Sequence, residues 1–300
     1  MKHLFIVNPA AGKGKTLNCI TQIENFFKKS KASYCIEVTE KPGHSTNIVK
    51  KHLQGGKTRV YSVGGDGTLN EILNGMIGSV GSLGIIPKGS GNDFIKSIDI
   101  SYKSGDIMER TIKGREVPVD IGRVNGRYFI NIASVGFDAE VAHNAVKFKK
   151  LPLIPGSLAY ILSTIITAIR KKNNLLEIRI DDRLIRTKVL LVAIANGKYY
   201  GGGVMPAPEA SLDDGMFDIC LVEDMPVRKI LKFLPKYIKG QHKHIDGVHF
   251  FRSRSVSIRS SNDIVMNVDG ETEIVKNAVF EIIPKGINII FPQGVMKKEA

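Results

Sequence analysis

The feature that most constrains this chain is the alternation of short apolar runs with helix-patterned segments over its first 98 residues. Each apolar run is followed by a segment with helical spacing. The runs cover 4–8, 34–39, 59–63 and 82–87, and the helices are expected near 16–30, 44–53, 68–77 and from about Asn92 onward. This alternation predicts a parallel β-sheet with helices on both faces. Ligands bind such sheets at the carboxyl ends of the strands, where the loops gather.

A change of pattern after Val117 predicts a second domain built mainly of β-strands. The dipeptides Asn125-Gly126 and Asp181-Asp182 lie between alternating apolar runs and indicate hairpins. Further strands are expected over 216–222, 249–260, 263–269, 278–284 and 287–292, and helices near 157–172 and 226–239. We therefore expect one domain over 1–120, to which 287–300 returns, and a second domain over 121–286.

The charge of the chain is strongly positive but evenly spread. Lys and Arg number 43 against 29 Asp and Glu, for a net charge of +14; residues 1–120 carry +6 of it and residues 121–300 carry +8. A nucleic-acid-binding protein usually concentrates its basic residues in an arm or stripe, and this chain has no Trp for base stacking. The distribution disfavours nucleic acid, whereas anionic membranes and small anions would attract the same charge.

The cysteines and apolar segments indicate a cytoplasmic protein. Cys19, Cys35 and Cys220 are odd in number and spaced unlike a disulfide framework or a paired zinc site. The glycine-rich N-terminus does not resemble a signal peptide. The segment 151–169 carries no charge, as in a membrane span, but Pro152 and the residues after it leave only about 14 helical positions, which is short for a span. A buried helix is the expectation.

The most informative segment is SVGGDGTLNE, residues 62–71, in which an apolar run ends in Gly64-Gly65-Asp66-Gly67 before a helix. Glycines let backbone N–H groups approach phosphate oxygens, and a helix N-terminus adds partial positive charge. A carboxylate there suits a cation bridging to the phosphates, while the alternative is a tight turn in which Asp66 caps a helix. Similar loops cover 8–15, with Lys13 and Lys15, and 87–94.

Three glycine-bearing loops at one sheet edge predict a polyphosphate nucleotide as the ligand. Two common nucleotide-binding patterns are excluded. The dinucleotide pattern requires a third glycine where Asn70 stands, and the P-loop pattern ending at Thr16 requires glycine where Pro9 stands.

The sequence closely resembles the diacylglycerol kinase-like lipid kinases, a family that includes sphingosine and ceramide kinases. The matching segments are NPAAGKGK (8–15), VGGDGTLNEILNG (63–75), IPKGSGNDFIKSI (86–98), VDIGRVN (119–125), FINIASVGFDAEV (129–141), ANGKYYGGGVMPAPEASLDDGMFDI (195–219) and VDGE (268–271). They recur in family order over nearly the whole chain. The length resembles that of the compact bacterial members.

The resemblance implies a fold of two parts. These are an α/β nucleotide-binding domain like that of NAD kinase and phosphofructokinase, and a mainly antiparallel β-sandwich lipid kinase domain, with the active site between them. It also implies ATP-dependent phosphorylation of a lipid hydroxyl, with diacylglycerol preferred as the acceptor. Phosphatidylglycerol, a sphingoid base or undecaprenol are the alternative acceptors. PKGSGNDF and VDGE favour the lipid kinases over NAD kinase or phosphofructokinase relatives. The alternative in another class is a non-catalytic, nucleotide-responsive membrane-binding protein.

The resemblance also assigns roles to residues. Asp66 and Asp93 match essential acids, Asp66 acting through nucleotide-bound Mg²⁺, and Glu271 matches the general base that accepts the lipid hydroxyl's proton. Taken alone, Glu271 reads as a turn glutamate. The expected nucleotide contacts are Asn8, Pro9, Ala10, Ala11, Gly12, Thr39, Gly65, Asp66, Gly67, Thr68, Leu69, Asn70, Glu71 and Ser90; the family often has Thr at the position of Ser90. The Ser211 and Met216 carbonyls and the Asp214 carboxylate match a structural Mg²⁺ site that Asp120 supports through water.

The lipid side is expected to lie at a membrane surface. PVRKILKFLPKYIK, residues 226–239, has five basic residues and no acid, as in a basic amphipathic helix on an anionic bilayer. A solvated face of a globular helix is the alternative. The helix near 157–169 is a candidate lining for an acyl-chain cleft. We expect an enzyme peripherally associated with the inner face of the membrane, and a homodimer is compatible with these features.

Overall fold

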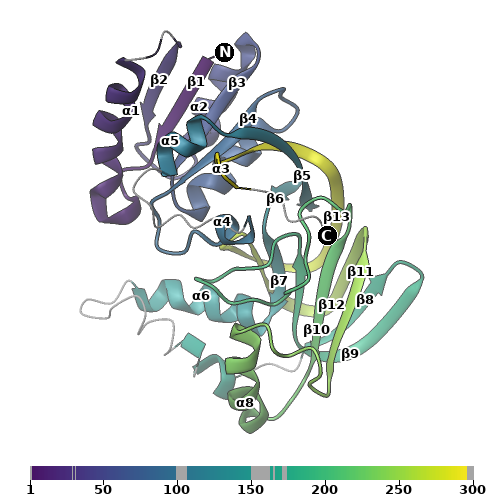
Figure 1. The fold of residues 1–300 in the computed structure, drawn as a ribbon. Helices are drawn as coiled ribbons and strands as arrows, with labels where there is room; N and C mark the ends of the chain where they lie inside the picture. Colours follow the sequence, from purple (N-terminus) through teal and green to yellow (C-terminus); the bar gives the residue numbers. More distant parts are fainter. Residues whose placement is uncertain are drawn as a thin grey trace. The chain divides into compact units, whose positions relative to one another are not determined.

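The computed structural model describes residues 2–28, 30, 32–98, 107–149, 163–164, 166–170 and 174–295 (Figure 1). The chain forms two compact units. Unit 1 comprises Met1–Ile121 and Ile283–Ala300, and unit 2 comprises Gly122–Ile282. The chain therefore enters unit 2 once and returns to unit 1 at its end.

Unit 1 is built on a parallel sheet with the strand order β13-β4-β3-β1-β2. The first four strands in the chain are β1 (Lys2–Val7), β2 (Tyr34–Val38), β3 (Thr58–Gly64) and β4 (Ser82–Pro87). The end of β13 (Glu271–Phe291) adds a parallel strand beside β4, with Asn288 opposite Ser82. Because both faces of β1, β3 and β4 are buried, these strands consist of nearly continuous apolar runs.

Short helices connect these strands. They are α1 (Asn18–Lys28), α2 (His44–His52), α3 (Asp66–Met76), α4 (Asp93–Ser97) and α5 (Ile107–Ile112), with 3₁₀ turns over Ala11–Leu17 and Leu53–Gly55. The buried side of α1, including Ile23 and Phe27, packs on one face of the sheet against Phe5 and Tyr61. The alternation of strands and helices along the sequence is thus confirmed as a parallel α/β layer.

Unit 2 is an antiparallel structure. Its strands are β6 (Arg127–Phe129), β7 (Ile132–Gly136), β8 (Asn174–Ile180), β9 (Arg183–Ala195), β10 (Phe217–Glu223), β11 (Val248–Ser253), β12 (Ser255–Val268) and the start of β13. The order is β11-β10-β9-β7-β12-β13, and β8 pairs with both β9 and β12. β5 (Arg115–Val124) ends in a hairpin with β6, in which Asn125 and Gly126 both have positive φ, as their dipeptide predicts.

Two apolar cores lie on opposite sides of β9. Val192 and Ile194 face the core between the strands, whereas Leu191 and Ala193 face a second core. The helices α6 (Phe137–Lys149) and α8 (Val227–Ile238) contribute to this second core. The predicted combination of an α/β domain with a β-sandwich is therefore confirmed, and the helix expected over 226–239 is α8.

Three sequence expectations differ from the structure or lie outside it. The runs 278–284 and 287–292 belong to one strand, β13, rather than two. The strand expected over 249–260 is divided at Arg254 into β11 and β12, and β12 continues to Val268 through the break that was expected at 261–262. Most of the apolar segment 151–169 lies outside the described residues, although 163–164 and 166–169 are helical. Among the helices that the structure describes, none combines the length and the apolar character needed to cross a bilayer.

Candidate active site

The three glycine-bearing loops of unit 1 meet at the carboxyl ends of β1, β3 and β4. The Asn8 side chain after β1 donates a hydrogen bond to Thr68 Oγ1 in α3 at 2.9 Å, and its Oδ1 accepts the Ala10 N–H at 3.0 Å. After β4, the Lys88 and Gly89 N–H groups donate to the Gly64 carbonyl at 2.8 and 3.0 Å. Contacts between the loops thus fix the edge that the sequence identified as a nucleotide site.

Glycine is required where these loops touch. A Cβ on Gly89 would lie 2.4 Å from Gly65 Cα, and a Cβ on Gly12, which has φ +60°, would lie 2.5 Å from the Lys88 carbonyl oxygen. Neither contact is sterically allowed, so the backbones approach closely only because side chains are absent. Gly65 is half-buried in this junction, and Ser90, the residue after Gly89, is exposed.

Asp66 and Asp93 also belong to this edge. Asp66 is the first residue of α3, and its Oδ1 accepts the Asp93 N–H at 2.9 Å, so Asp66 binds the start of α4. Asp93 is buried and pairs with Lys96 at 2.7 Å between Oδ1 and Nζ. A Cβ on Gly91 would lie 2.7 Å from Asp66 Oδ2 and 3.4 Å from Asp93 Oδ2, so the two carboxylates flank this glycine.

The remaining residues that the sequence predicts to contact the nucleotide differ in their burial and in their hydrogen bonds. The Leu69 and Asn70 side chains are buried in α3, and Thr39 is buried after β2, where its N–H donates to the Val7 carbonyl at 2.9 Å. The Glu71 carboxylate accepts the Gly43 and Ser45 N–H groups at 2.7 and 3.2 Å. Glu71 therefore caps α2, because the first N–H groups of a helix need external acceptors. Its place at the nucleotide stays a prediction, which these hydrogen bonds do not test.

The other members of that set lie closer to the surface. The predicted contacts Ala10 and Gly67 are exposed, and Pro9 and Ala11 are half-buried. Lys15, in the first glycine loop, is also exposed. Their positions leave these groups accessible at the same sheet edge.

Glu271 lies in unit 2 beside a turn that hydrogen bonds of Asp269 hold in place. Asp269 and Gly270, both with positive φ, join β12 to β13 in a two-residue hairpin, and Glu271 is the exposed first residue of β13. The Asp269 carboxylate accepts three N–H groups, from Ile130 at 2.9 Å, Asn131 at 3.1 Å and Ile132 at 3.0 Å. These bonds fix the turn on β7 and thereby hold Glu271 in one place.

The loop SLDDGMFD, residues 211–218, carries the candidate metal contacts. Asp214 Oδ1 accepts the Met216 N–H at 3.0 Å, its other oxygen pairs with Arg252, and Ser211 Oγ donates to Asp213 Oδ1 at 3.0 Å. Burial raises the pKa of Asp218 to about 6, against the opposing effect of Arg252. Asp218 Oδ2 is buried and makes no hydrogen bond within the described part of the chain.

The loop offers the kinds of oxygen that a hard cation prefers, which are carboxylate, hydroxyl and carbonyl oxygens, and one of its carboxylate oxygens, Asp218 Oδ2, is buried without a hydrogen bond in the described part of the chain. Arg252 already balances part of the acidic charge. Asp120, in unit 1, accepts the Lys285 N–H at 2.7 Å and is fully buried.

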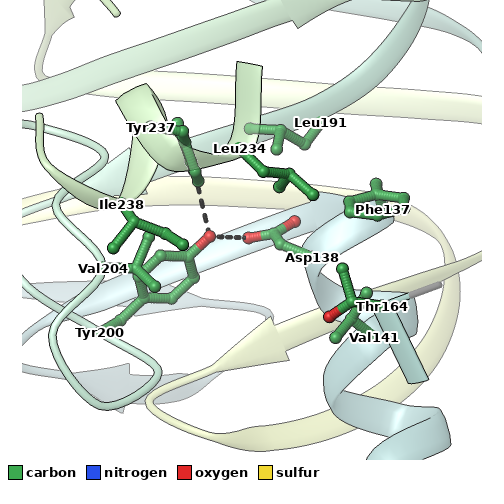
Figure 2. A pocket seen from close by; sticks show the side chains of 10 residues that line it. All are labelled: Phe137, Asp138, Val141, Thr164, Leu191, Tyr200, Val204, Leu234, Tyr237 and Ile238. Carbon is green, nitrogen blue, oxygen red and sulfur yellow. Dashed lines mark hydrogen bonds between the residues drawn. The ribbon is translucent and has the colours of Figure 1, made fainter. Parts of the chain in front are cut away.

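Unit 2 also contains an apolar cavity of about 230 Å³, shown in Figure 2. Its apolar wall is formed by side chains from α6, β9, the loop before β10, and α8: Phe137, Val141, Leu191, Val204, Leu234 and Ile238. Leu191 and Val141 are buried, whereas Ile238 is 47% exposed, so the cavity runs from the protein surface to the second core. Thr164, which belongs to the segment 157–169 that the sequence offers as a candidate cleft lining, also lines this cavity. None of the described cavity residues is among the predicted catalytic, nucleotide or metal contacts.

The outer side of α8 is basic and partly apolar. Ile230, Phe233 and Tyr237 are buried, while the exposed residues include Leu231, which is 56% exposed. The basic side chains Arg228, Lys229, Lys232, Lys236 and Lys239 are all exposed. One face of α8 therefore lines the cavity while the other presents positive charge to solvent.

Comparison with known proteins identifies relatives over the whole chain. Residues 2–124 match the model of the diacylglycerol kinase catalytic domain, and residues 131–291 match the YegS C-terminal NAD kinase beta sandwich-like domain. The chain is 30% identical to a diacylglycerol kinase of Staphylococcus epidermidis, over 98% of this chain and 93% of that protein. It is 28% identical to one of Bacillus subtilis, over 96% of each chain.

Solved structures agree with these matches. A crystal structure of a candidate diacylglycerol kinase from Bacillus anthracis matches with a TM-score of 0.78 at 25% identity, over 98% of this chain and 96% of that one. A second structure from the same organism, at 20% identity, has a TM-score of 0.72 over 98% of each chain and supports the fold alone.

Proposed function

Because the chain belongs to the diacylglycerol kinase family, we propose that it transfers the γ-phosphoryl group of ATP to the free hydroxyl of diacylglycerol. The hydroxyl oxygen forms the new bond to Pγ, the bond from Pγ to the β–γ bridging oxygen breaks, and the products are phosphatidic acid and ADP. The observation that carries this proposal is the meeting of three glycine loops with Asp66 and Asp93 at one sheet edge.

Unit 1 supplies the donor side of the proposed reaction. The close backbone contact of Gly65 with Gly89 leaves no side chain over the backbone at this junction, and Gly67 at the start of α3 is exposed. Such a surface suits a polyphosphate, and the start of α3 adds partial positive charge. Asp66 stands at that helix start, where its carboxylate serves the Mg²⁺ that enters with ATP as part of the substrate.

Asp93 acts differently in this proposal. It is buried and paired with Lys96, and its N–H holds the Asp66 carboxylate. We assign Asp93 a positioning role, because its contacts orient Asp66 rather than reach outward. Breaking a buried ion pair of this kind is costly, since it leaves one charge without its partner.

Unit 2 supplies the acceptor side. The Asp269 anchor holds the exposed Glu271 carboxylate, which accepts the proton of the lipid hydroxyl as the phosphoryl group transfers. Positioning and electrostatic stabilisation provide most of the rate in phosphoryl transfer, and a general base contributes about 10²- to 10⁴-fold. At the 211–218 loop, Asp214 with the Ser211 and Met216 carbonyls would hold a structural Mg²⁺, whose charge would stabilise this acidic loop.

The apolar cavity and α8 suit a lipid acceptor. The cavity is smaller than the roughly 300–1,000 Å³ typical of sites for drug-sized ligands, so it accommodates a segment of one acyl chain. The exposed basic side chains of α8 favour an anionic bilayer surface, where each contributes about 1 kcal/mol. The lipid thus reaches the cavity from the membrane side of α8.

The proposal is tested by measuring ATP-dependent phosphorylation of diacylglycerol, phosphatidylglycerol, sphingosine and undecaprenol in mixed micelles. We expect diacylglycerol to have the highest kcat/KM. Glu271→Gln should lower kcat about 100-fold on diacylglycerol, consistent with loss of a general base. Glu273→Gln, two residues along β13, is the matched control and should retain activity. If no lipid in the panel is phosphorylated, the proposed function is wrong; if Glu271→Gln is fully active, Glu271 is not the base.

A further inference from the structure

Three side chains of the kinds that bind transition metals meet at the edge of the sheet of unit 1. Cys35 and Glu37 are two positions apart on β2, the edge strand, so their side chains lie on the same face. His52, the last residue of α2, lies against Glu37. One ligand atom from each of the three lies within 4.8 Å of the other two. Within the described part of the chain, no other group of three Cys, His or acidic side chains meets this closely.

The separations within this cluster are near those around a tetrahedral zinc ion. His52 Nε2 lies 2.9 Å from Glu37 Oε1, and Cys35 Sγ lies 3.9 Å from the same oxygen. Zinc bonds of about 2.1 Å to nitrogen and oxygen and about 2.3 Å to sulfur would separate N from O by about 3.4 Å and S from O by about 3.6 Å. All three residues are half-buried, so movements of up to about 1 Å would place their ligand atoms around one ion.

The chemistry of these ligands selects the kind of metal. A thiolate with an imidazole suits Zn²⁺ and similar transition metals, whereas Mg²⁺ and Ca²⁺ prefer oxygen ligands alone. The Cys35 thiolate and the Glu37 carboxylate would together carry two negative charges, which balance a divalent ion. On binding, the S–H bond of Cys35 breaks, its proton passes to solvent, and the sulfur electron pair forms the bond to the metal.

Lys2 orients the imidazole of this cluster. Lys2 Nζ lies 3.4 Å from His52 Nδ1, and because an ammonium group only donates, Nδ1 accepts this hydrogen bond. Nε2 of the neutral ring therefore carries the proton, which it donates to Glu37. Binding of a metal at Nε2 requires this proton to move to Nδ1 and the Lys2 hydrogen bond to break. Lys2 is exposed, so its side chain can turn into solvent, but its charge opposes a bound cation.

A second histidine–glutamate pair shows what the thiol adds. In unit 2, His249 Nε2 lies 2.9 Å from Glu223 Oε1, the same separation as between His52 and Glu37. Among the described residues, no third Cys, His or acidic side chain completes a cluster at that pair. The cysteine therefore distinguishes the β2 cluster from an ordinary ion pair.

We propose that Cys35, Glu37 and His52 form a Zn²⁺-binding site that joins the edge strand β2 to the end of α2. Three protein ligands leave the fourth position to water, since the Glu37 side chain is 38% exposed. The site involves none of the residues assigned to ATP, Mg²⁺ or the lipid, so it goes beyond the proposed function and does not depend on it. A metal held by the folded arrangement stabilises the protein.

The test is a Zn²⁺ titration of the untagged, reduced protein in millimolar Mg²⁺, with a chromogenic chelator as competitor. We expect one Zn²⁺ to bind per chain with a micromolar or lower dissociation constant, without displacement by Mg²⁺. Co²⁺ in place of Zn²⁺ should give the near-ultraviolet charge-transfer band of a thiolate ligand. Cys35→Ser and His52→Gln should each weaken Zn²⁺ binding by about 10-fold or more, because each removes a ligand.

Two further variants make the assignment specific. His249→Gln is the matched control and should bind Zn²⁺ as the wild type does. Lys2→Gln should bind Zn²⁺ more tightly, because it removes the opposing charge. Far-UV circular dichroism shows whether each variant folds, and the cobalt spectrum of the wild type requires no variant.

Three results would overturn the inference. They are a wild type that binds no Zn²⁺ at micromolar concentration, a cobalt complex without the thiolate band, and undiminished Zn²⁺ binding in folded Cys35→Ser. Each of them leaves the proposed kinase function in place, because lipid phosphorylation is measured separately.

Discussion

Replacing Asp269 should disturb both the stability of unit 2 and the placement of Glu271. The Asp269 carboxylate accepts three backbone N–H groups at 2.9–3.1 Å from residues 130–132. Hydrogen bonds to a charged group contribute about 1.5–3 kcal/mol each, although the contributions are not additive. Water can replace part of this bonding, because Asp269 is half-buried at a turn. We therefore expect Asp269→Ala to lower the free energy of unfolding by about 3–5 kcal/mol.

Asp269→Asn is the milder perturbation. Asparagine tolerates the φ of +48° at this position, so the turn itself is not strained. Its single acceptor oxygen cannot replace both carboxylate oxygens, and its amide group would face a backbone N–H. We expect a loss of about 1–2 kcal/mol in the free energy of unfolding, and a lower kcat because Glu271 is held less firmly.

Urea unfolding followed by far-UV circular dichroism measures this change, since the chain has no tryptophan. Hydrogen exchange at the amides of 130–132 reports the three bonds directly and should be faster in both variants. Asp263→Asn is the control, because Asp263 is 70% exposed in a weak ion pair with Lys276 at 3.9 Å. Unchanged unfolding energy and unchanged exchange in Asp269→Ala would refute the anchoring role.

Three further predictions concern other parts of the chain. Gly89→Ala should raise the dissociation constant for ATP at least 10-fold by isothermal titration calorimetry, because the new Cβ lies 2.4 Å from Gly65 Cα. Burial lowers the pKa of His3 to about 4, whereas the unfolded imidazole protonates near 6.5. The free energy of unfolding should therefore fall by about 1.6 kcal/mol between pH 6.5 and pH 5, and His3→Gln should remove this dependence. The Lys232→Glu, Lys236→Glu double variant should bind vesicles containing anionic phospholipid less tightly at low salt; equal binding would exclude a membrane role for α8.

The layout of unit 1 could be predicted from the sequence because its signals are local. Each apolar run of β1 to β4 is directly followed by a helix or loop signal, so periodicity alone places the elements. The glycine loops could be located for the same reason, since parallel strands bring their carboxyl ends to one edge. The contact of Gly65 with Gly89 then follows from the sheet order.

The length of β13 could not be predicted in this way. Pro284-Lys285-Gly286 resembles a turn, and Lys285 does have a positive φ of +53°. However, the Lys285 N–H is held by Asp120, and the strand continues past this irregularity to Phe291. The partner that keeps the strand intact lies 165 residues away, so no local pattern reveals it.

The residues that hold the site in place could not be recognised from the sequence either, because their partners are also distant along the chain. Asp269 lies in the matched segment VDGE, but its carboxylate binds N–H groups of residues 137–139 positions earlier in the chain, which no local pattern reveals. Asp138 lies in the matched segment 129–141, but its hydrogen-bond partner Tyr200 stands 62 residues later in the chain, so this contact could not be predicted from a local pattern. The hydrogen bonds by which Glu71 caps α2 join residues 26 and 28 positions apart, so they too could not be predicted from a local pattern.

The most direct test of lipid phosphorylation follows the phosphoryl group itself. The protein is incubated with ATP labelled at the γ-phosphorus, Mg²⁺ and dioleoylglycerol in mixed micelles with anionic phospholipid, and the extracted lipid is separated and counted. We predict that the label appears in phosphatidic acid at a rate proportional to the protein concentration, and that Asp66→Asn abolishes this transfer. Label recovered only as inorganic phosphate, or lipid labelling that survives in Asp66→Asn, would contradict the proposed reaction at this site.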